Sequence, residues 1–373
     1  MANEKKILGV IDHFGSGGSQ RQFVHLMNGL ARMGYKVTIF TYHESLDFFK
    51  DDISHKHIKI YSVEKKKIRW IGVVKSLRRV VGEVEPNFVI SFLHIPNLLC
   101  EFLSFFTSIP CLIVSERTSR HDDKNFFIRY VRRIMHSRAT KVVVNSTDHH
   151  RWLTKKFRWL AHRTACIYNG IDNKFFDAEI PQHPGNKLKF IGIGRIDCNK
   201  NPILVVESLI LFAKKNGWCP KFEWIGRVGH KKKDVAYFEK VNKLIISNDV
   251  VKSSWTWTEE SKDISAVLAK SHVLIHPSRY EGLPNVVCEA LAMGRPVLAS
   301  KVCEHPYLVG QQGERGFLFQ INDSKSLAKS IEELTSMTSL QWNGLSVRCR
   351  IYAEVNFKLT EMVIKFEKLL RKN

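Results

Sequence analysis

Hydrophobic and polar positions follow two different periods along the chain, and the two periods alternate. Short runs of consecutive apolar residues predict buried strands, whereas longer segments with apolar residues every three or four positions predict helices. Alternating strands and helices indicate a parallel sheet covered by helices on both faces. In the first half, the predicted strands are Ile7–Ile11, Lys36–Thr41, Phe88–Phe92, Cys111–Ser115 and Lys141–Asn145, and the predicted helices are Ser19–Met33, Val73–Val84 and Asn97–Phe106.

The same alternation begins again after Ala178–Lys187, a polar stretch with proline and glycine that is typical of a domain linker. The predicted strands of the second half are Lys189–Ile193, Phe222–Ile225, Val273–His276 and Val297–Ser300, and its predicted helices are Ile203–Asn216, Tyr237–Ser247 and Val286–Met293.

Two domains are therefore expected, and a length of 373 residues also favours two. We predict Rossmann-like α/β/α domains over residues 1–180 and 187–355. They are expected to face each other across a cleft between the carboxyl ends of their strands, because ligands of open α/β sheets bind at that edge. The closing segment 345–373 has a helical pattern, and we expect residues 356–373 to cross back and pack on the first domain.

The composition is that of an ordinary globular protein, with 44% apolar and 25% charged residues. No apolar run is long enough for a transmembrane helix, and the start of the chain lacks the apolar core of a signal peptide. The eight cysteines are scattered without a Cys-x-x-Cys pair, so we expect reduced thiols rather than disulfides or a zinc site. These features predict a cytoplasmic protein.

The formal net charge is +22, and two segments carry most of it. Residues 64–80 hold seven Lys/Arg against one Glu, and residues 117–163 hold thirteen against three Asp. This predicts an anionic partner, either nucleic acid, an acidic membrane or a phosphorylated substrate, although solvated helix faces would explain it too. For residues 64–80 we favour a helix lying on anionic lipid, because apolar residues recur there at helical spacing among the basic ones. They are Ile68, Trp70, Ile71, Val74, Leu77, Val80 and Val81.

A glycine-rich stretch, 15-GSGGSQRQF-23, follows the first predicted strand and opens a helix. Gly17 and Gly18 let the backbone approach a ligand closely, and the N–H groups at the start of the helix favour an anion. A plain strand-to-helix turn would explain the glycines equally. The spacing differs from Gly-x-Gly-x-x-Gly and no acidic residue ends the second strand, which argues against a nicotinamide cofactor.

Arg195 and Lys200 stand in 192-GIGRIDCNKNP-202, at the carboxyl end of the first strand of the second half. At that place they could converge on one diphosphate, which Arg binds as a fork and Lys as a point charge. They could also be two unrelated surface cations.

Glu281 and Glu289 lie in 278-SRYEGLPNVVCEALAMGRPVLAS-300, with seven residues between them. Pro284 suits the first turn of a helix, so Glu281 precedes this helix and Glu289 lies inside it. The free N–H groups near Leu283–Val286 favour phosphate, whereas the two carboxylates would repel it and suit ribose or sugar hydroxyls instead. Together, the three loops predict a site for a sugar diphosphate.

On these motifs the chain resembles a family 4 glycosyltransferase of the two-domain GT-B fold, over nearly its whole length. EGLPNVVCE followed by ALAMGRPVLAS is similar to the family's E-x7-E signature, and GRIDCNKNP is similar to its G-R-x4-K loop. GSGGSQRQ stands where the family has a glycine-rich loop, and 94-HIPN-97 is similar to its H-x-P-N segment. Gln20 replaces the glutamate of the family's Gly-Gly-x-Glu-Arg loop, so we assign it no catalytic role.

The resemblance implies a role for each candidate residue. Arg195 and Lys200 would hold the diphosphate of a nucleotide sugar, Glu289 the ribose hydroxyls, and Glu281 the donor sugar. His94 would be a histidine of the first domain that lies near the sugar. Catalysis would depend on His94, Glu281, Arg195 and Lys200. The backbone of neighbouring residues would also contact the donor, namely Gly17, Gly18, Gly282, Leu283, Pro284 and Asn285.

The implied reaction transfers a sugar, with retention of anomeric configuration, from a nucleotide donor to an acceptor hydroxyl. A UDP-sugar is the first choice by frequency in the family. No Asp-x-Asp triplet occurs, so we expect no metal and no cofactor besides the donor, and the cations would stabilise the leaving diphosphate. No carboxylate nucleophile is identified, so a front-face route is the working hypothesis.

The acceptor is expected to be lipid-linked or a polysaccharide. The stretch 88-FVISFLHIPN…IVSERTSR-120 resembles the branch of the family that builds bacterial surface polysaccharides and lipid-linked oligosaccharides. The product would be lipopolysaccharide O-antigen or capsule. We therefore expect peripheral association with the inner face of the cell membrane through residues 64–80 and 117–163.

Two other hypotheses stay open. A basic nucleic-acid-binding protein would fit the interleaved basic and aromatic residues of 126-FFIRYVRR-133 and 151-RWLTKKFRW-159, but it leaves Glu281 and Glu289 unexplained. The other hypothesis is an inactive homologue that still binds the donor, and the full set of site residues argues against it. No nucleic-acid partner is therefore expected.

Overall fold

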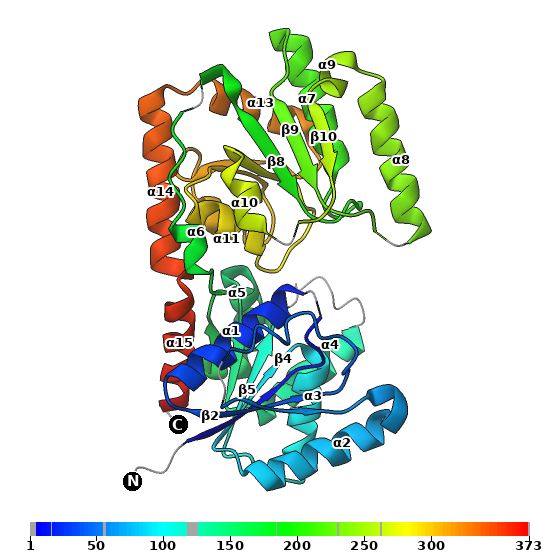
Figure 1. Cartoon of the computed structure of the whole chain (residues 1–373), viewed down its shortest axis with the longest axis vertical. Coiled ribbons are helices and arrows are strands. Elements are labelled where there is room, and N and C mark those ends of the chain that lie inside the picture. Colours follow the sequence, from blue (N-terminus) through cyan, green and yellow to red (C-terminus); the bar gives the residue numbers. More distant parts are fainter. Residues whose placement is uncertain are drawn as a thin grey trace. The chain divides into compact units, whose positions relative to one another are not determined.

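The computed structural model describes residues 5–15, 17–54, 57–117, 126–183, 185–229, 231–261 and 263–371. The chain divides into two compact units, one of Met1–Gly170 with Leu359–Asn373 and the other of Ile171–Lys358. Each unit contains a parallel sheet with helices packed on it, which confirms the predicted fold class (Figure 1). Within the described ranges, no helix is both long and apolar enough to cross a bilayer.

The first unit contains a seven-stranded sheet in the order β3-β2-β1-β4-β5-β6-β7, and every neighbouring pair is parallel. Its strands are β1 (Lys6–Val10), β2 (Lys36–Thr41), β3 (Lys59–Ser62), β4 (Phe88–Phe92), β5 (Cys111–Glu116), β6 (Lys141–Val144) and β7 (Thr164–Cys166). β2 and β4 match the prediction to the residue, whereas the edge strands β3 and β7 have no predicted counterpart.

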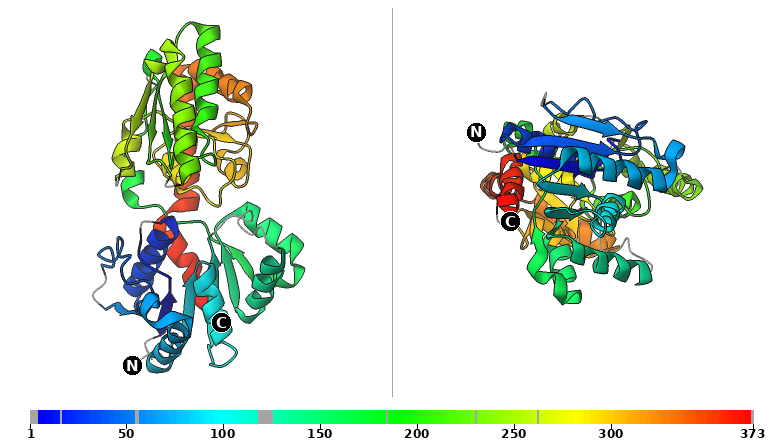
Figure 2. Two further views of the ribbon diagram at one scale, coloured as in Figure 1. Left: turned by 90° about the vertical axis from the view of Figure 1, so that its right-hand side faces the viewer. Right: turned by 90° about the horizontal axis from the view of Figure 1, so that it is seen from below.

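Helices cover both faces of this sheet because successive side chains of a strand point to opposite sides. Ile7 and Leu8 of β1 therefore enter two different hydrophobic clusters. α1 and α15 close the Ile7 side, where they lie side by side (Figures 1 and 2), and α2, α3 and α5 close the Leu8 side. The helices of the unit are α1 (Gly18–Arg32), α2 (Lys65–Val84), α3 (His94–Leu103), α4 (Phe126–Met135), α5 (Thr147–Lys156), α15 (Leu359–Arg371) and the 3-10 turns η2 (His136–Arg138) and η3 (Arg158–Arg163).

Helix α2 buries the later part of the apolar stripe that the sequence analysis assigned to lipid. The buried stripe residues are Leu77, Val80 and Val81, each at most 5% exposed, whereas Ile68 and Val74 are partly buried. Trp70 and Ile71 remain exposed, at 41% and 73%. A side chain cannot face the core and a membrane at once, so the prediction of a helix lying on lipid along residues 64–80 is wrong for the later part of α2, where the stripe is buried.

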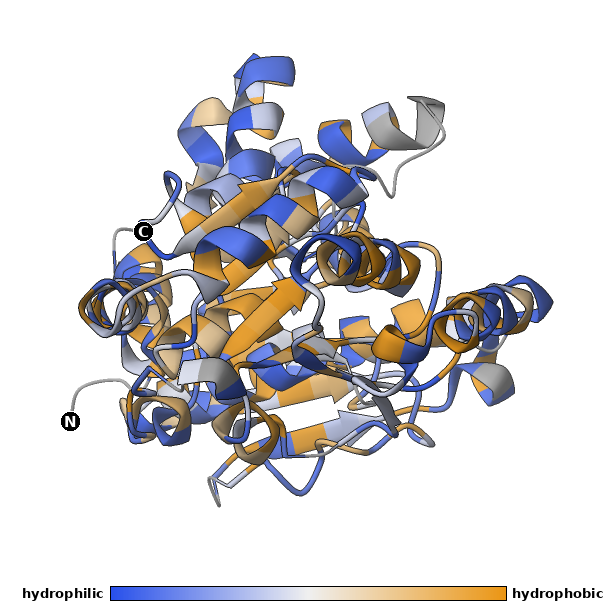
Figure 3. Cartoon of the chain, turned by 90° about the horizontal axis from the view of Figure 1, so that it is seen from above, coloured by the Kyte–Doolittle hydropathy of each residue, from blue (hydrophilic) through white to orange (hydrophobic). Residues whose placement is uncertain are grey.

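The second unit contains a six-stranded parallel sheet in the order β10-β9-β8-β11-β12-β13. Its strands are β8 (Lys189–Ile193), β9 (Lys221–Ile225), β10 (Trp255–Thr258), β11 (Val273–His276), β12 (Val297–Ser300) and β13 (Gly316–Phe319). The strands carry mostly hydrophobic colours in Figure 3, whereas the helices show both colours. β8, β11 and β12 match the prediction to the residue, and the edge strands β10 and β13 have no predicted counterpart.

Helices α7 and α13 pack side by side in this unit, and α11 packs on α14. The fully buried side chains of Trp224 and Trp342 belong to its core. Its helices are α6 (Asn173–Phe176), α7 (Pro202–Asn216), α8 (Lys232–Ile246), α9 (Asp249–Lys252), α10 (Ile264–Ala269), α11 (Asn285–Ala292), α12 (His305–Val309), α13 (Ser324–Thr335), α14 (Ser339–Phe357) and the 3-10 turn η4 (Gly185–Lys187).

The boundary between the units lies at Gly170 and Ile171, ahead of the linker predicted at Ala178–Lys187. Hydrogen bonds hold the residues after Ile171 to the second unit. Arg295 Nη1 donates to the carbonyl of Glu179 at 2.9 Å, and Trp342 Nε1 donates to the carbonyl of Pro181 at 2.9 Å. The stretch is therefore tied to the second unit at Glu179 and Pro181.

Gly316 gives a test of the second sheet. It opens β13 with a φ of 141°, and an added Cβ would stand 1.9 Å from the carbonyl oxygen of Val297 on β12. We expect Gly316→Ala to lower the free energy of unfolding by about 2 kcal/mol or more, because the edge strand must move away from β12. Urea denaturation followed by circular dichroism measures this loss.

Gly82→Ala is the matched control. Gly82 lies in α2 and an added Cβ would have no neighbour within 4 Å. Since alanine favours a helix over glycine, this variant should gain up to about 1 kcal/mol. Equal stability of the two variants would contradict the close packing described for Gly316.

Candidate functional site

Asp197 organises the loop that follows β8, although the sequence analysis did not single it out. Its Oδ1 accepts hydrogen bonds from the backbone N–H groups of Asn199 at 3.0 Å and Lys200 at 2.8 Å. Its Oδ2 lies 3.5 Å from Nε of Arg195, whose side chain is 65% exposed. Asp side chains commonly accept a hydrogen bond from the backbone two residues further on, so an aspartate in this loop could have been considered from the sequence. Asp197 thus contacts both the backbone of Lys200 and the side chain of Arg195, and the convergence of the two cations on one diphosphate stays a prediction.

A reciprocal pair of hydrogen bonds joins this loop to the loop that follows β11. Asn199 Nδ2 donates to the carbonyl of Tyr280, and the N–H of Tyr280 donates back to Asn199 Oδ1, both at 3.2 Å. The N–H of Arg279 also donates to the carbonyl of Asn199 at 2.8 Å. These bonds hold Lys200 and Glu281 side by side, although 81 positions separate them in the sequence.

Lys200 and Glu281 form an ion pair with 2.6 Å between Nζ and Oε1. His276, at the end of β11, places Nε2 at 3.4 Å from the same oxygen. Burial alone would raise the pKa of Glu281, but the ammonium of Lys200 and the hydrogen bond from His276 outweigh burial and hold this pKa well below its ordinary value. Glu281 is therefore ionised and is able to accept hydrogen bonds from hydroxyls.

Two buried histidines that the sequence analysis missed support Glu281. The rings of His276 and His305 meet edge to face, with centroids 5.2 Å apart. Burial, followed by the charge of Lys200, lowers the pKa of His276, and burial lowers the pKa of His305 to about 3. His305 Nδ1 lies 2.7 Å from the carbonyl of Ser300. Both rings are neutral at neutral pH, so they fill space beside Glu281 without adding charge.

Helix α11 places the second glutamate. It begins at Asn285, one residue before the predicted start at Val286, and Pro284 is the N-cap residue with an extended ψ of 101°. The first N–H groups of any helix have no partner within it, so the Gly282–Asn285 turn can present such groups to a phosphate. Glu289 is 2% exposed inside α11, whereas the side chain of Glu281 is 15% exposed.

The glycine loop of the first unit is tightly packed. Gly17 is the N-cap residue of α1, and Gly18 is its first residue. An added Cβ at Gly17 would stand 2.1 Å from Oε1 of Gln20, whose Nε2 donates to Oδ1 of Asp12 at 3.3 Å. Gln20 therefore supports the loop from inside, while Ser16 lies outside the described residues.

His94 opens α3 directly after β4. The preceding Leu93 has a φ of 76° and a ψ of 161°, which is a strained conformation for a leucine. Asn97 donates through Nδ2 to the carbonyl of Ser115 at 3.0 Å and accepts from Ser91 Oγ at 2.7 Å. The H-x-P-N segment thus ties the start of α3 to the carboxyl ends of β4 and β5.

Three arginines of residues 117–163 lie inside the first unit, whereas five other basic residues of this segment are exposed, namely Arg138, Arg151, Lys155, Lys156 and Arg158. The buried arginines are Arg117, Arg132 and Arg133, each at most 7% exposed. Arg132 and Arg133 contact Glu116 at 3.0 Å and 3.2 Å. Arg132 and Arg133 therefore neutralise a buried carboxylate, which removes part of the argument for nucleic-acid binding. Residues 118–125 lie outside the described ranges.

In the part of the chain that the structure describes, no group of three or more His, Cys, Asp and Glu side chains could hold a metal ion. The eight cysteines are free thiols.

The Lys200–Glu281 pair predicts a pH dependence of stability. Because the pKa of Glu281 is depressed in the folded state, its contribution is complete above its ordinary value of 4.5 and is lost as pH falls below that value. We expect Glu281→Gln to unfold more easily than the native chain at pH 7, with a difference that shrinks on going to pH 3. Thermal melts between pH 3 and 7 measure it.

The matched control is Glu332→Gln, which removes the exposed pair between Lys215 and Glu332 at 2.7 Å. Exposed ion pairs contribute little to stability, so this variant should have the same melting temperature as the native chain at each pH between 3 and 7. A difference for Glu281→Gln that stays constant with pH would rule out the depressed pKa.

Two family models match the chain: Glycosyltransferase Family 4 over residues 16–175 and Glycosyl transferases group 1 over residues 187–337. A Campylobacter jejuni relative, GalNAc-alpha-(1->4)-GalNAc-alpha-(1->3)-diNAcBac-PP-undecaprenol alpha-1,4-N-acetyl-D-galactosaminyltransferase, is 26% identical over 338 residues, 88% of each chain. An Escherichia coli relative, UDP-Gal:alpha-D-GlcNAc-diphosphoundecaprenol alpha-1,3-galactosyltransferase, is 26% identical over 184 residues, 49% of this chain and 45% of that one.

Solved structures share the fold over the full length. A glycosyltransferase from Rickettsia africae matches with a TM-score of 0.84 at 17% identity, covering 99% of this chain and 98% of that one. HepE from Anabaena, in complex with UDP, matches with a TM-score of 0.81 at 17% identity, covering 99% and 100%. With a family model on each half and this fold throughout, the chain belongs to the GT-B glycosyltransferases, with a family 4 model on its first half and a group 1 model on its second.

Proposed function

We propose that the protein is a retaining hexosyltransferase that moves a sugar from a UDP-sugar to a hydroxyl of a lipid-linked acceptor, in the synthesis of a bacterial surface glycan. The observation that carries the proposal is the joined pair of loops in the second unit, which holds Arg195, Lys200 and Glu281 at one edge of the sheet. The names of the Campylobacter and Escherichia relatives, both of which include diphosphoundecaprenol or PP-undecaprenol, support the acceptor. The HepE complex supports UDP as the nucleotide.

The site suits a sugar diphosphate because its cations can bind phosphate oxygens while its carboxylates can accept hydrogen bonds from hydroxyls. Arg195 is exposed and can grip phosphate oxygens as a fork. The ammonium of Lys200 has three N–H donors. One can donate to Glu281 while another donates to a phosphate oxygen. Glu281 keeps Oε1 on Lys200 and would accept a sugar hydroxyl with Oε2, while Glu289 would serve the ribose.

The reaction needs no metal in this proposal. The bond between the anomeric carbon and the diphosphate oxygen breaks, and the acceptor oxygen forms a new bond to that carbon on the same face. The acceptor proton passes to the leaving diphosphate. Arg195, Lys200 and the N–H groups at the start of α11 would stabilise the charge that develops on this diphosphate.

The donor proposal is tested with a panel of nucleotide sugars. We expect a UDP-sugar to raise the melting temperature and to be hydrolysed slowly. Arg195→Ala should weaken nucleotide affinity by about tenfold or more, since charge-assisted hydrogen bonds contribute roughly 1.5–3 kcal/mol. Glu289→Ala should also lose nucleotide affinity, whereas Glu281→Ala should keep it and lose sugar transfer. Calorimetry with UDP and turnover with the UDP-sugar separate these effects.

Lys214→Ala, on the exposed last turn of α7, is the control and should bind UDP like the native chain. Unchanged UDP affinity in Arg195→Ala would overturn the diphosphate assignment. Binding without any turnover, across donors and lipid-linked acceptors, would favour the inactive homologue.

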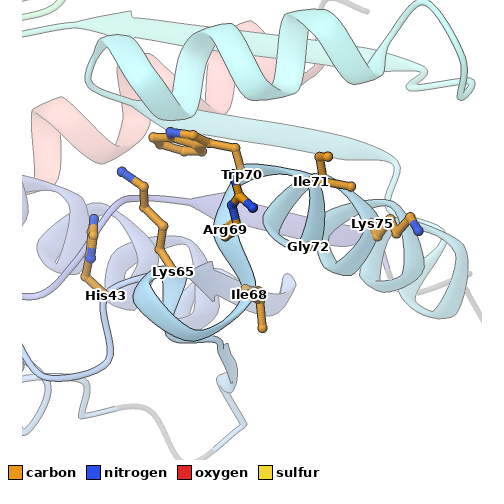
Figure 4. Close-up of a pocket in the computed structure, with 8 residues that line it drawn as sticks. All are labelled: His43, Lys65, Ile68, Arg69, Trp70, Ile71, Gly72 and Lys75. Atoms are coloured by element: carbon orange, nitrogen blue, oxygen red, sulfur yellow. The ribbon is translucent and has the colours of Figure 1, made fainter.

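We propose a narrower membrane contact than the sequence pattern suggested. Arg69 has non-helical angles, φ 55° and ψ −178°, which kink α2 near its start. Lys65 Nζ lies 3.8 Å from the centroid of the Trp70 ring, and the two side chains face each other in Figure 4, with Ile71 on the following turn. An open pocket of about 840 Å³ lies here, lined also by Lys75. Exposed apolar side chains surrounded by lysines are typical of a segment that binds an anionic lipid surface.

Vesicles of phosphatidylglycerol test this contact. We expect the native chain to sediment with them, less so at high salt, and not to sediment with neutral phosphatidylcholine. The double variant Trp70→Ser with Ile71→Ser should bind at least about tenfold more weakly, since each buried apolar side chain contributes roughly 1.5–3 kcal/mol. Leu340→Ser, which removes an 85% exposed residue of the second unit, is the control. Binding that ignored anionic lipid would exclude the proposal.

A further inference from the structure

We propose that Arg132 acts as a positioning residue that holds His94 as the neutral tautomer with its proton on Nε2. His94 would then serve sugar transfer as an oriented hydrogen-bond donor and not as a base. The inference rests on the proposed transfer reaction, because His94 has its role only there.

The geometry around His94 leaves one assignment for its ring. Arg132 Nη2 lies 3.2 Å from Nδ1 of His94. A guanidinium has five N–H donors, no acceptor and no readily lost proton. Nδ1 must therefore present its lone pair, and the proton of the neutral ring sits on Nε2. A doubly protonated ring would set two donors face to face, so the contact disfavours the imidazolium as well.

Arg132 is itself fixed by a buried carboxylate. Nη2 also lies 3.0 Å from Oε1 of Glu116, the last residue of β5. The side chains of Arg132 and Glu116 are 6% and 1% exposed. Since both partners are withdrawn from water, the guanidinium has little freedom to leave His94. The contact is thus a built feature of the fold and not a surface encounter.

Glu116 is the centre of a larger cluster that holds it in place. Its Oε1 also accepts from His136 Nε2 at 3.0 Å and pairs with Arg133 Nη1 at 3.2 Å. His149 Nε2 lies 3.2 Å from its Oε2. His136 in turn places Nδ1 2.6 Å from Oε1 of Glu101. A buried ionic cluster of this kind is often less stabilising than apolar packing, so its value lies in fixing groups precisely in space.

The backbone fixes the other end of His94. Leu93 is held in the left-handed region at φ 76°, and Asn97 ties the first turn of α3 to β4 and β5. Strained residues of this kind cluster at functional sites. The imidazole is therefore aimed by its backbone and locked in tautomer by Arg132, as an oriented donor to developing charge requires. This role leaves the acceptor proton to the leaving diphosphate.

The tautomer can be measured on the unmodified protein. The chain is labelled with 15N-histidine, and the His94 signals are assigned from their loss in His94→Gln. At pH 7 we expect Nδ1 of His94 in the unprotonated range and Nε2 in the protonated range. A proton on Nδ1, or on both nitrogens, would overturn the proposal. Because this measurement needs no activity, it stands apart from any failure of the proposed function.

Paired variants separate positioning from stability. Arg132→Gln and Arg133→Gln each remove one cation from Glu116, and the Arg133 guanidinium lies 5.5 Å from the Trp152 ring centroid. We expect Arg132→Gln to mix the His94 tautomers and to lower kcat by about 10- to 100-fold with little change in donor KM. Arg133→Gln should leave the His94 tautomer unchanged and retain most of kcat, even if it lowers the melting temperature. Equal losses of kcat with an unchanged His94 spectrum would show that Arg132 is only structural.

Discussion

A parallel sheet sends the carboxyl ends of all its strands to one edge, and the candidate site residues of both units are placed by this constraint. In the first unit, Gly17 follows β1 and His94 follows β4. In the second unit, Arg195 follows β8 and Glu281 follows β11. Backbone pairing alone therefore gathers residues that are distant in sequence, and each loop needs only to orient what the sheet has already assembled.

Central strands could be predicted from the sequence because they are buried on both faces and are written as unbroken apolar runs. β4, β11 and β12 are buried at every position, and their predicted bounds match to the residue. The four strands without a predicted counterpart, β3, β7, β10 and β13, are the edges of the two sheets. β3 and β7 contain no fully buried position, so their sequences carry no strong pattern to recognise.

Residues of the candidate site could be singled out from the sequence where they stand in a local motif, as Lys200 and Glu281 do. It was not predictable where the contact depends on tertiary structure, as with the support that Glu116 gives to Arg132. Net charge shows the same limit. Counting Lys and Arg cannot tell a surface cation from one that neutralises a buried carboxylate, and Arg132 and Arg133 belong to the second kind.

The reciprocal bonds between Asn199 and Tyr280 have a consequence for how this sequence can change. Insertions are usually tolerated in surface loops, because a loop needs only to connect its two ends. Here a residue added to either loop would break the two hydrogen bonds between the Asn199 side chain and the Tyr280 backbone and displace Lys200 from Glu281. Neither loop can therefore change its length without loss of this contact. A change in donor preference has to come from side-chain substitutions within loops of constant length.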